Sequence, residues 1–175
     1  AGEVAPVISN LPEEIAKKYG FKVIRHNEEI GGSWHSPDTI FVSNNETMRH
    51  YSAGNWTGKD TKDFISSKEY PENFITAAHE TTHGLFSKNP EKGHIALKKL
   101  KELGIPQDVA FESLVDLGGL YLLEPKAITN KDILGVIKDW LSDVPTIPPS
   151  HQAIGVTNEF IYNPADEVAP VVSKE

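Results

Sequence analysis

Two histidines and a glutamate stand close together in the stretch AHETTHG, which begins at Ala78. His79 and His83 are four residues apart, so on a helix both side chains project from the same face and can bind one Zn²⁺ through neutral imidazole nitrogens. Glu80 follows His79, and its carboxylate is expected to take a proton from a water molecule that the metal activates. The H-E-x-x-H pattern therefore predicts a catalytic zinc site.

The neighbours of this motif decide between a zinc site and a solvated surface helix. Composition alone would produce the pattern in about one of forty chains with this content of histidine and glutamate. Ala77, Ala78, Leu85 and Phe86 make the helix largely apolar, which is unusual for an exposed polar face. Burying two histidines and a glutamate there without a partner would cost several kcal/mol. A bound metal removes that cost, so the apolar neighbours favour the zinc site.

A third metal ligand is available in the most apolar helical stretch of the chain, DVAFESLVDLGGLYLL, at residues 108–123. Glu112 and Asp116 are four residues apart and therefore share one helix face. Two carboxylates within an otherwise apolar helix require a cation or a hydrogen-bond donor, unless they lie at the helix edge in water. Both alternatives are open from the residues alone.

The combination of H-E-x-x-H with a later E-x-x-x-D resembles the gluzincin metallopeptidases. In that family the first carboxylate of the second helix binds zinc, and the second carboxylate orients a ligand histidine. The resemblance implies that His79, His83 and Glu112 bind zinc, that Glu80 is the general base, and that Asp116 lies behind His79.

Other histidines offer weaker alternatives. The metzincin pattern requires glycine and histidine where this chain has Phe86 and Asn89, so that pattern is excluded. His94 could bind the metal only with a different geometry. His151 and Tyr162 are candidate oxyanion donors of the kind that peptidases use. The remaining histidines are interpreted as ordinary polar residues: His26, His35 and His50.

A closer resemblance covers roughly residues 20–124. The stretches GGSWHSPDTIFVSN, YPENFITAAHETTHGLFS and AFESLVDLGGLYLL are similar, in this order, to the metallopeptidase domain of ArdC-type antirestriction proteins and phage polyvalent proteins. The resemblance implies a strand beside the active-site cleft that binds an extended peptide by β-augmentation. Asp38, Ile40 and Val42 occupy that strand's pattern, so Ile40 and Val42 are expected to contact the substrate. The stretch HGLFSKN after the motif departs from the pattern of the family.

Composition limits the classes of protein that fit. A chain of 175 residues and 19.3 kDa with 38% hydrophobic residues can bury the core of one domain, and we expect a monomer. The absence of cysteine leaves histidines and carboxylates as metal ligands. A net charge of −8 disfavours a general nucleic-acid surface or an anionic membrane as partner. No apolar run approaches the roughly 20 residues of a membrane span.

The expected fold class is α+β and zincin-like, with a small N-terminal sheet and a mainly helical C-terminal half. Two strands are candidates for one sheet, and a turn-rich connection at residues 29–38 separates them. The stretch 46–70 has no assignment. The strands are predicted at residues 21–26 and 39–43, and the helices at 11–20, from 71 through the motif, and at about 91–103, 107–123 and 130–142.

The two ends of the chain carry a repeat. AGEVAPV at residues 1–7 returns as ADEVAPV at 165–171, which indicates either flexible flanking linkers or a repeated processing signal. The final SKE resembles the cleavage site of prohead proteases of some tailed phages. The predicted organisation is a linker at 1–10, the metallopeptidase domain at 11–145 and an extended proline-containing tail at 146–175. A soluble, processed product that is secreted, phage-packaged or delivered into a cell is one expectation.

Two functions from different classes fit these residues. The first is a zinc metalloendopeptidase that hydrolyses a protein or peptide substrate. The second is a zincin-fold binding or inhibitory protein, of antirestriction or phage-packaged type, in which the metal is structural. Three protein ligands with an open fourth position favour the first, and four protein ligands favour the second. Glu80 favours catalysis, because a structural site needs no general base.

Overall fold

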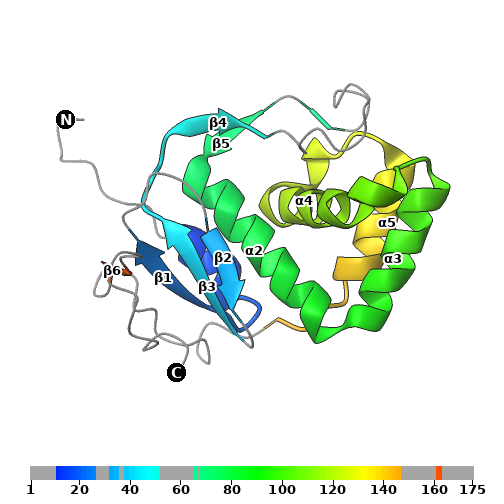
Figure 1. Ribbon diagram of the computed structural model, residues 1–175. Coiled ribbons are helices and arrows are strands. Elements are labelled where there is room, and N and C mark those ends of the chain that lie inside the picture. Colours follow the sequence, from blue (N-terminus) through cyan, green and yellow to red (C-terminus); the bar gives the residue numbers. More distant parts are fainter. Residues whose placement is uncertain are drawn as a thin grey trace.

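The structure is a computed structural model that describes residues 11–26, 32–35, 38–51, 65–66, 68–146 and 161–162. It is an α+β protein with a small mixed sheet and a mostly helical remainder (Figure 1). The coarse fold class predicted from the sequence is therefore confirmed. Among the described residues, no helix combines the length and the apolar character needed to cross a membrane.

The helices lie close to their predicted ranges. The range predicted at 107–123 divides into a 3-10 turn and an α-helix, and two glycines with positive φ, Gly20 at 90° and Gly104 at 104°, follow the first and third helices. Asn89 and Asn130 cap two helices by accepting backbone N–H groups. The helices are α1 (Leu11–Lys17), α2 (Glu72–Lys88), α3 (Pro90–Glu102), η2 (Gln107–Val109), α4 (Ala110–Leu123), η3 (Pro125–Ala127) and α5 (Lys131–Leu141).

The two predicted strands share one sheet, as expected. β1 (Lys22–His26) and β3 (Thr39–Ser43) are parallel neighbours. β2 (Gly32–His35) pairs antiparallel with β3, and β6 (Ile161–Tyr162) pairs parallel with β1, which gives the order β2-β3-β1-β6. β3 is therefore an interior strand with a partner on each side.

Four strands lie where the sequence predicted none. β2 falls within the stretch predicted as a turn-rich connection, and β6 falls within the predicted tail. β4 (Met48–His50) and β5 (Glu69–Pro71) form a separate antiparallel ribbon in the unassigned stretch. All four are two to four residues long, so their stability comes from pairing with another strand rather than from a local pattern.

Helix α2 lies at the centre of the molecule, between the sheet and α4 (Figure 1). Its residues Ala77 and Leu85 belong to the hydrophobic core, together with Val23 and Ile40 of the sheet and Leu117 of α4. This central position fixes the helix on both sides. The H-E-x-x-H motif is therefore carried by a well-packed element.

A buried ion pair attaches α1 to the sheet. Arg25 is 0% exposed, and its Nε and Nη2 atoms donate to the Glu13 carboxylate at 2.6 and 3.0 Å. Arg25 Nη1 also donates to Asn44 Oδ1 at 3.3 Å. The pair satisfies both buried charges.

The terminal repeat, the predicted linker at 1–10 and most of the predicted tail lie outside the described residues. Only residues 161–162 in the second half of that tail are described, as β6.

Candidate metal centre

Two consecutive glycines of α4 allow it to approach α2 closely. A Cβ atom at Gly119 would lie 3.2 Å from the backbone nitrogen of His79 and 3.3 Å from the carbonyl carbon of Ala78. A Cβ atom at Gly118 would lie 2.6 Å from Cγ2 of Thr82. Larger residues at these positions would hold the helices apart. This role was not predicted from the sequence, although adjacent glycines inside an apolar helix were a visible signal.

The close approach brings three potential ligands together. His79, His83 and Glu112 each offer one ligand atom, and these atoms all lie within 4.8 Å of one another. Glu112 Oε1 is 3.5 Å from His79 Nε2, and Glu112 Oε2 is 3.8 Å from His83 Nε2. Ligand atoms around tetrahedral zinc are roughly 3.4 Å apart, because each lies about 2.0–2.2 Å from the metal. The donor set and its spacing therefore fit a zinc ion.

Asp116 fixes the orientation of one of these histidines. Its Oδ1 atom is 2.8 Å from Nδ1 of His79. When the ring is neutral and Nδ1 donates to this carboxylate, the Nε2 atom that faces Glu112 is unprotonated and can bind a metal. The structure thus places Asp116 where the resemblance to gluzincins put it, behind His79.

Tyr51 supports the same arrangement from outside the two helices. Its hydroxyl donates to the backbone carbonyl of Asp116, and the residue is 5% exposed. Tyr51 lies in the unassigned stretch, far from Asp116 in the sequence, so no local pattern could have predicted this contact.

The local electrostatics shift the pKa values of the two histidines in opposite directions. Burial, followed by the charge of His79, lowers the pKa of His83 to about 4, so His83 is neutral at pH 7. Burial also lowers the pKa of His79, but the hydrogen bond and charge of Asp116 and the charges of Glu80 and Glu112 outweigh it, and the pKa is raised. His83 is thus available to a cation, whereas a cation at His79 would compete with a proton.

Glu80 lies beside this group. Burial, together with the charges of Glu112 and Asp116 and against that of His79, raises the pKa of the Glu80 carboxyl to about 6. A carboxylate with this pKa can accept and return a proton near neutral pH.

Two aromatic rings border the candidate metal centre. The rings of Phe111 and His83 have centroids 5.6 Å apart, and the rings of Phe111 and Phe86 are 5.1 Å apart. His94 lies beyond them, against Phe86 at 5.1 Å. His94 is not one of the three residues whose ligand atoms converge.

The structure does not bring Ile40 and Val42 to the metal centre. Both are 0% exposed within β3, and both edges of β3 are already paired. The expectation that this strand binds a peptide is therefore corrected, because neither its edges nor these side chains are accessible.

The remaining candidates lie elsewhere. Tyr162 lies in β6 and pairs with His26 of β1. β6 is at the end of the sheet order opposite β2 and lies away from α4 (Figure 1). His151 lies outside the described residues. His26 is buried in β1, and His50 lies 3.3 Å from Glu69 in the β4–β5 ribbon. His35 is in β2.

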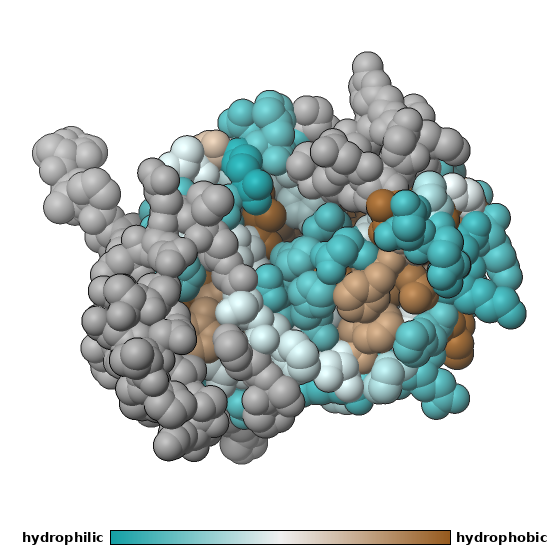
Figure 2. All heavy atoms as spheres, in the orientation of Figure 1, coloured by the Kyte–Doolittle hydropathy of each residue, from teal (hydrophilic) through white to brown (hydrophobic). Residues whose placement is uncertain are grey.

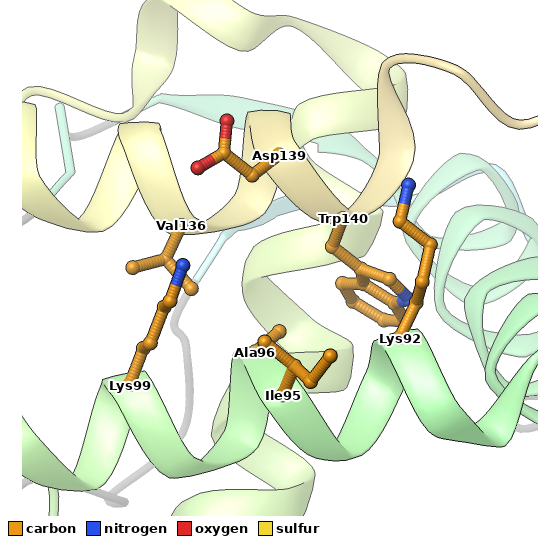
Figure 3. A pocket seen from close by; sticks show the side chains of 7 residues that line it. All are labelled: Lys92, Ile95, Ala96, Lys99, Val136, Asp139 and Trp140. Carbon is orange, nitrogen blue, oxygen red and sulfur yellow. The ribbon is translucent and has the colours of Figure 1, made fainter.

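Two hollows lie away from the metal centre. One, of about 200 Å³, lies between α3 and α5, with Ala96, Val136 and Trp140 as its apolar floor and Lys92 and Lys99 at its rim (Figure 3). The other, of about 490 Å³, lies near the C-terminal end of α2 and shares Lys92. Neither hollow is lined by the three potential ligands.

A scan against protein-family models found no match for this chain, and searches of curated proteins and of solved structures found none either.

Proposed function

We propose that the protein is a zinc-dependent metallopeptidase of the zincin type. One observation carries the proposal: ligand atoms of His79, His83 and Glu112 converge from two helices to within 4.8 Å of one another. Glu80 and Asp116 lie beside this group in positions that suit a general base and an orienting carboxylate. Zinc, when bound, supplies a Lewis acid that polarises a carbonyl group and lowers the pKa of water.

Residues of the chain have the remaining roles in catalysis. Asp116 holds His79 in the tautomer that leaves Nε2 available. Glu80 accepts a proton from the attacking water and delivers it to the leaving amine, for which a pKa of about 6 is well suited. Glu112 is 59% exposed, so this side of the group is open to solvent and to a substrate.

The pattern of contacts favours catalysis over a structural metal. Asp116 approaches the far nitrogen of His79, so its carboxylate supports the ligand set without completing it. Within the part of the chain that the structure describes, three residues offer ligand atoms, and three protein ligands would leave one position for a reactant, as in catalytic rather than structural zinc sites. The alternative function is a binding protein with a structural metal, and measurements of zinc content and proteolysis distinguish it from a peptidase.

The first test is the zinc content of the purified protein. We expect one equivalent of zinc in the wild-type protein and in Glu91→Ala, which removes an exposed carboxylate from α3. We expect Glu112→Ala to lose most of the zinc and His79→Ala to lose all of it. Zinc retained undiminished by Glu112→Ala would remove Glu112 from the ligand set.

The second test separates catalysis from binding. Glu80→Gln should keep one equivalent of zinc but fail to cleave unfolded protein substrates, with products followed by mass spectrometry. Proteolysis that survives in Glu80→Gln would refute the proposed base. A zinc-loaded wild-type protein that cleaves nothing would support the binding protein with a structural metal.

A further inference from the structure

An exposed aromatic ring lies directly against the candidate metal centre. Phe111 is 39% exposed, although most large apolar side chains of the described residues are buried. It precedes Glu112 in α4, and its ring contacts His83 with centroids 5.6 Å apart. A ring that touches one potential ligand and adjoins another in the sequence borders any substrate that reaches the metal.

Phe111 is the outer part of a supported aromatic surface. Phe86 is 9% exposed and meets Phe111 edge to face at 5.1 Å. Trp140 and His94 contact Phe86 from other sides, at 6.1 and 5.1 Å. At Gly93 of α3, a Cβ atom would lie 2.5 Å from the Phe86 ring, so α3 confines this ring tightly. Phe111 is therefore held on a rigid base.

The aromatic surface is apolar, whereas the residues next to it carry negative charge. Glu80, Glu112 and Asp116 lie on the side of the metal centre, and zinc would balance only part of their charge. Figure 2 shows the same contrast on the face where α2 and α4 meet: a hydrophilic group of side chains lies beside an apolar patch. An acidic substrate side chain at this patch would be repelled by the carboxylates, whereas an uncharged apolar one would bury the exposed ring.

We propose that Phe111, backed by Phe86, forms the specificity surface of the candidate site and takes a large apolar or aromatic side chain adjacent to the scissile bond. This inference rests on the proposed function and names the class of peptide that the site prefers. A substrate side chain that lies against Phe111 is brought next to the metal ligands, because the same ring contacts His83.

The test uses a set of peptides that are identical except at one residue, which is phenylalanine, leucine, alanine or glutamate. The measured quantities are kcat/KM for the zinc-loaded wild-type protein and Kd for Glu80→Gln, which binds without cleaving. We expect the phenylalanine and leucine peptides to exceed the alanine peptide by roughly tenfold or more, with the glutamate peptide the weakest.

The decisive variant is Phe111→Ala, with Ile95→Ala as its matched control. Ile95 is 51% exposed on α3 and lines the hollow between α3 and α5, so it tests the loss of an exposed apolar side chain elsewhere. We expect Phe111→Ala to reduce the preference for phenylalanine over alanine by about tenfold, and Ile95→Ala to preserve it. Phe111→Leu keeps the apolar volume and serves if the alanine variant does not fold, with partial retention of the preference expected.

The outcomes separate this inference from the proposed function. If Phe111→Ala weakens all peptides equally and also loses zinc, the ring only supports His83 and the inference is overturned. If wild-type protein cleaves peptides without preferring apolar residues, the inference fails and the proposed function stands. If nothing is cleaved but Glu80→Gln binds the phenylalanine peptide in a manner that depends on Phe111, the proposed function fails, and of the inference only the binding of an apolar side chain by Phe111 stands.

Discussion

The contact between α2 and α4 can be tested at Gly119. In Gly119→Ala the new Cβ atom would lie 3.2 Å from the backbone nitrogen of His79 and 3.3 Å from the hydroxyl of Tyr51, closer than the ordinary contact range of 3.4–4 Å. Because the first of these partners is backbone of a packed helix, α4 must move away by a few tenths of an ångström. Overpacking of this kind costs about 1–3 kcal/mol.

Gly135 provides a matched control for the intrinsic effect of alanine. It lies within α5, and a Cβ atom there would meet nothing within 4 Å. Both substitutions gain about 1 kcal/mol from the higher helix propensity of alanine. The propensity term cancels between the two variants, so Gly119→Ala should be less stable than Gly135→Ala by the packing cost alone, about 1–3 kcal/mol.

The assay is urea unfolding of both metal-free variants and the wild-type protein at pH 7, followed by titration with zinc. Since the 2.8 Å contact between His79 and Asp116 joins the two helices, a displaced α4 should also weaken zinc binding in Gly119→Ala but not in Gly135→Ala. If both variants are stabilised equally and bind zinc alike, the two helices are not in tight contact and the reasoning is wrong.

Three further predictions concern individual charges. Asp116→Asn should weaken zinc binding by about 10–100-fold, measured by competition with a chelator, and an unchanged affinity would show that this carboxylate does not orient His79. The folded-state pKa of Glu80 is raised from 4.5 to about 6, so the charged form of Glu80 destabilises the folded state increasingly as pH rises from 4.5 through 6. Glu80→Gln should therefore stabilise the metal-free protein by about 1–2 kcal/mol at pH 8 and by little at pH 4. Equal effects at both pH values would contradict the burial of this group. Arg25→Met leaves the Glu13 carboxylate buried without its partner and should lower the free energy of unfolding by about 3–5 kcal/mol, whereas Glu13→Leu combined with Arg25→Met should recover most of that loss in the same urea assay.

The elements of the candidate metal centre were predictable because their signals are local. His79 and His83 repeat at helical spacing, and so do Glu112 and Asp116. Each pair therefore identifies one face of one helix. Nothing in the spacing shows that the two faces meet. The resemblance to gluzincins supplied that step, and the structure brings His79, His83 and Glu112 together.

The features that escaped prediction depend on contacts between elements, which no local pattern reveals. Tyr51 reaches Asp116 from a stretch without helical or strand periodicity. β2 and β6 are too short to show an alternating pattern, and they exist through pairing with β3 and β1. The expectation for Ile40 and Val42 was wrong because sequence similarity located a strand correctly but gave no information about its neighbours in the sheet. Once β2 occupies that edge, β3 is an interior strand.

The potential ligands of the candidate metal centre are distributed over two helices, with α3 between them in the sequence. An ion held by both His83 and Glu112 would close the intervening segment into a loop. In this cysteine-free chain it would act as a cross-link, as a disulfide does in other proteins. Unlike a covalent bond, this cross-link dissociates when the free metal concentration falls, and its contribution to folding falls with it. The persistence of the folded protein would then depend on the metal supply of its surroundings, and a strong chelator would shorten its lifetime against other proteases.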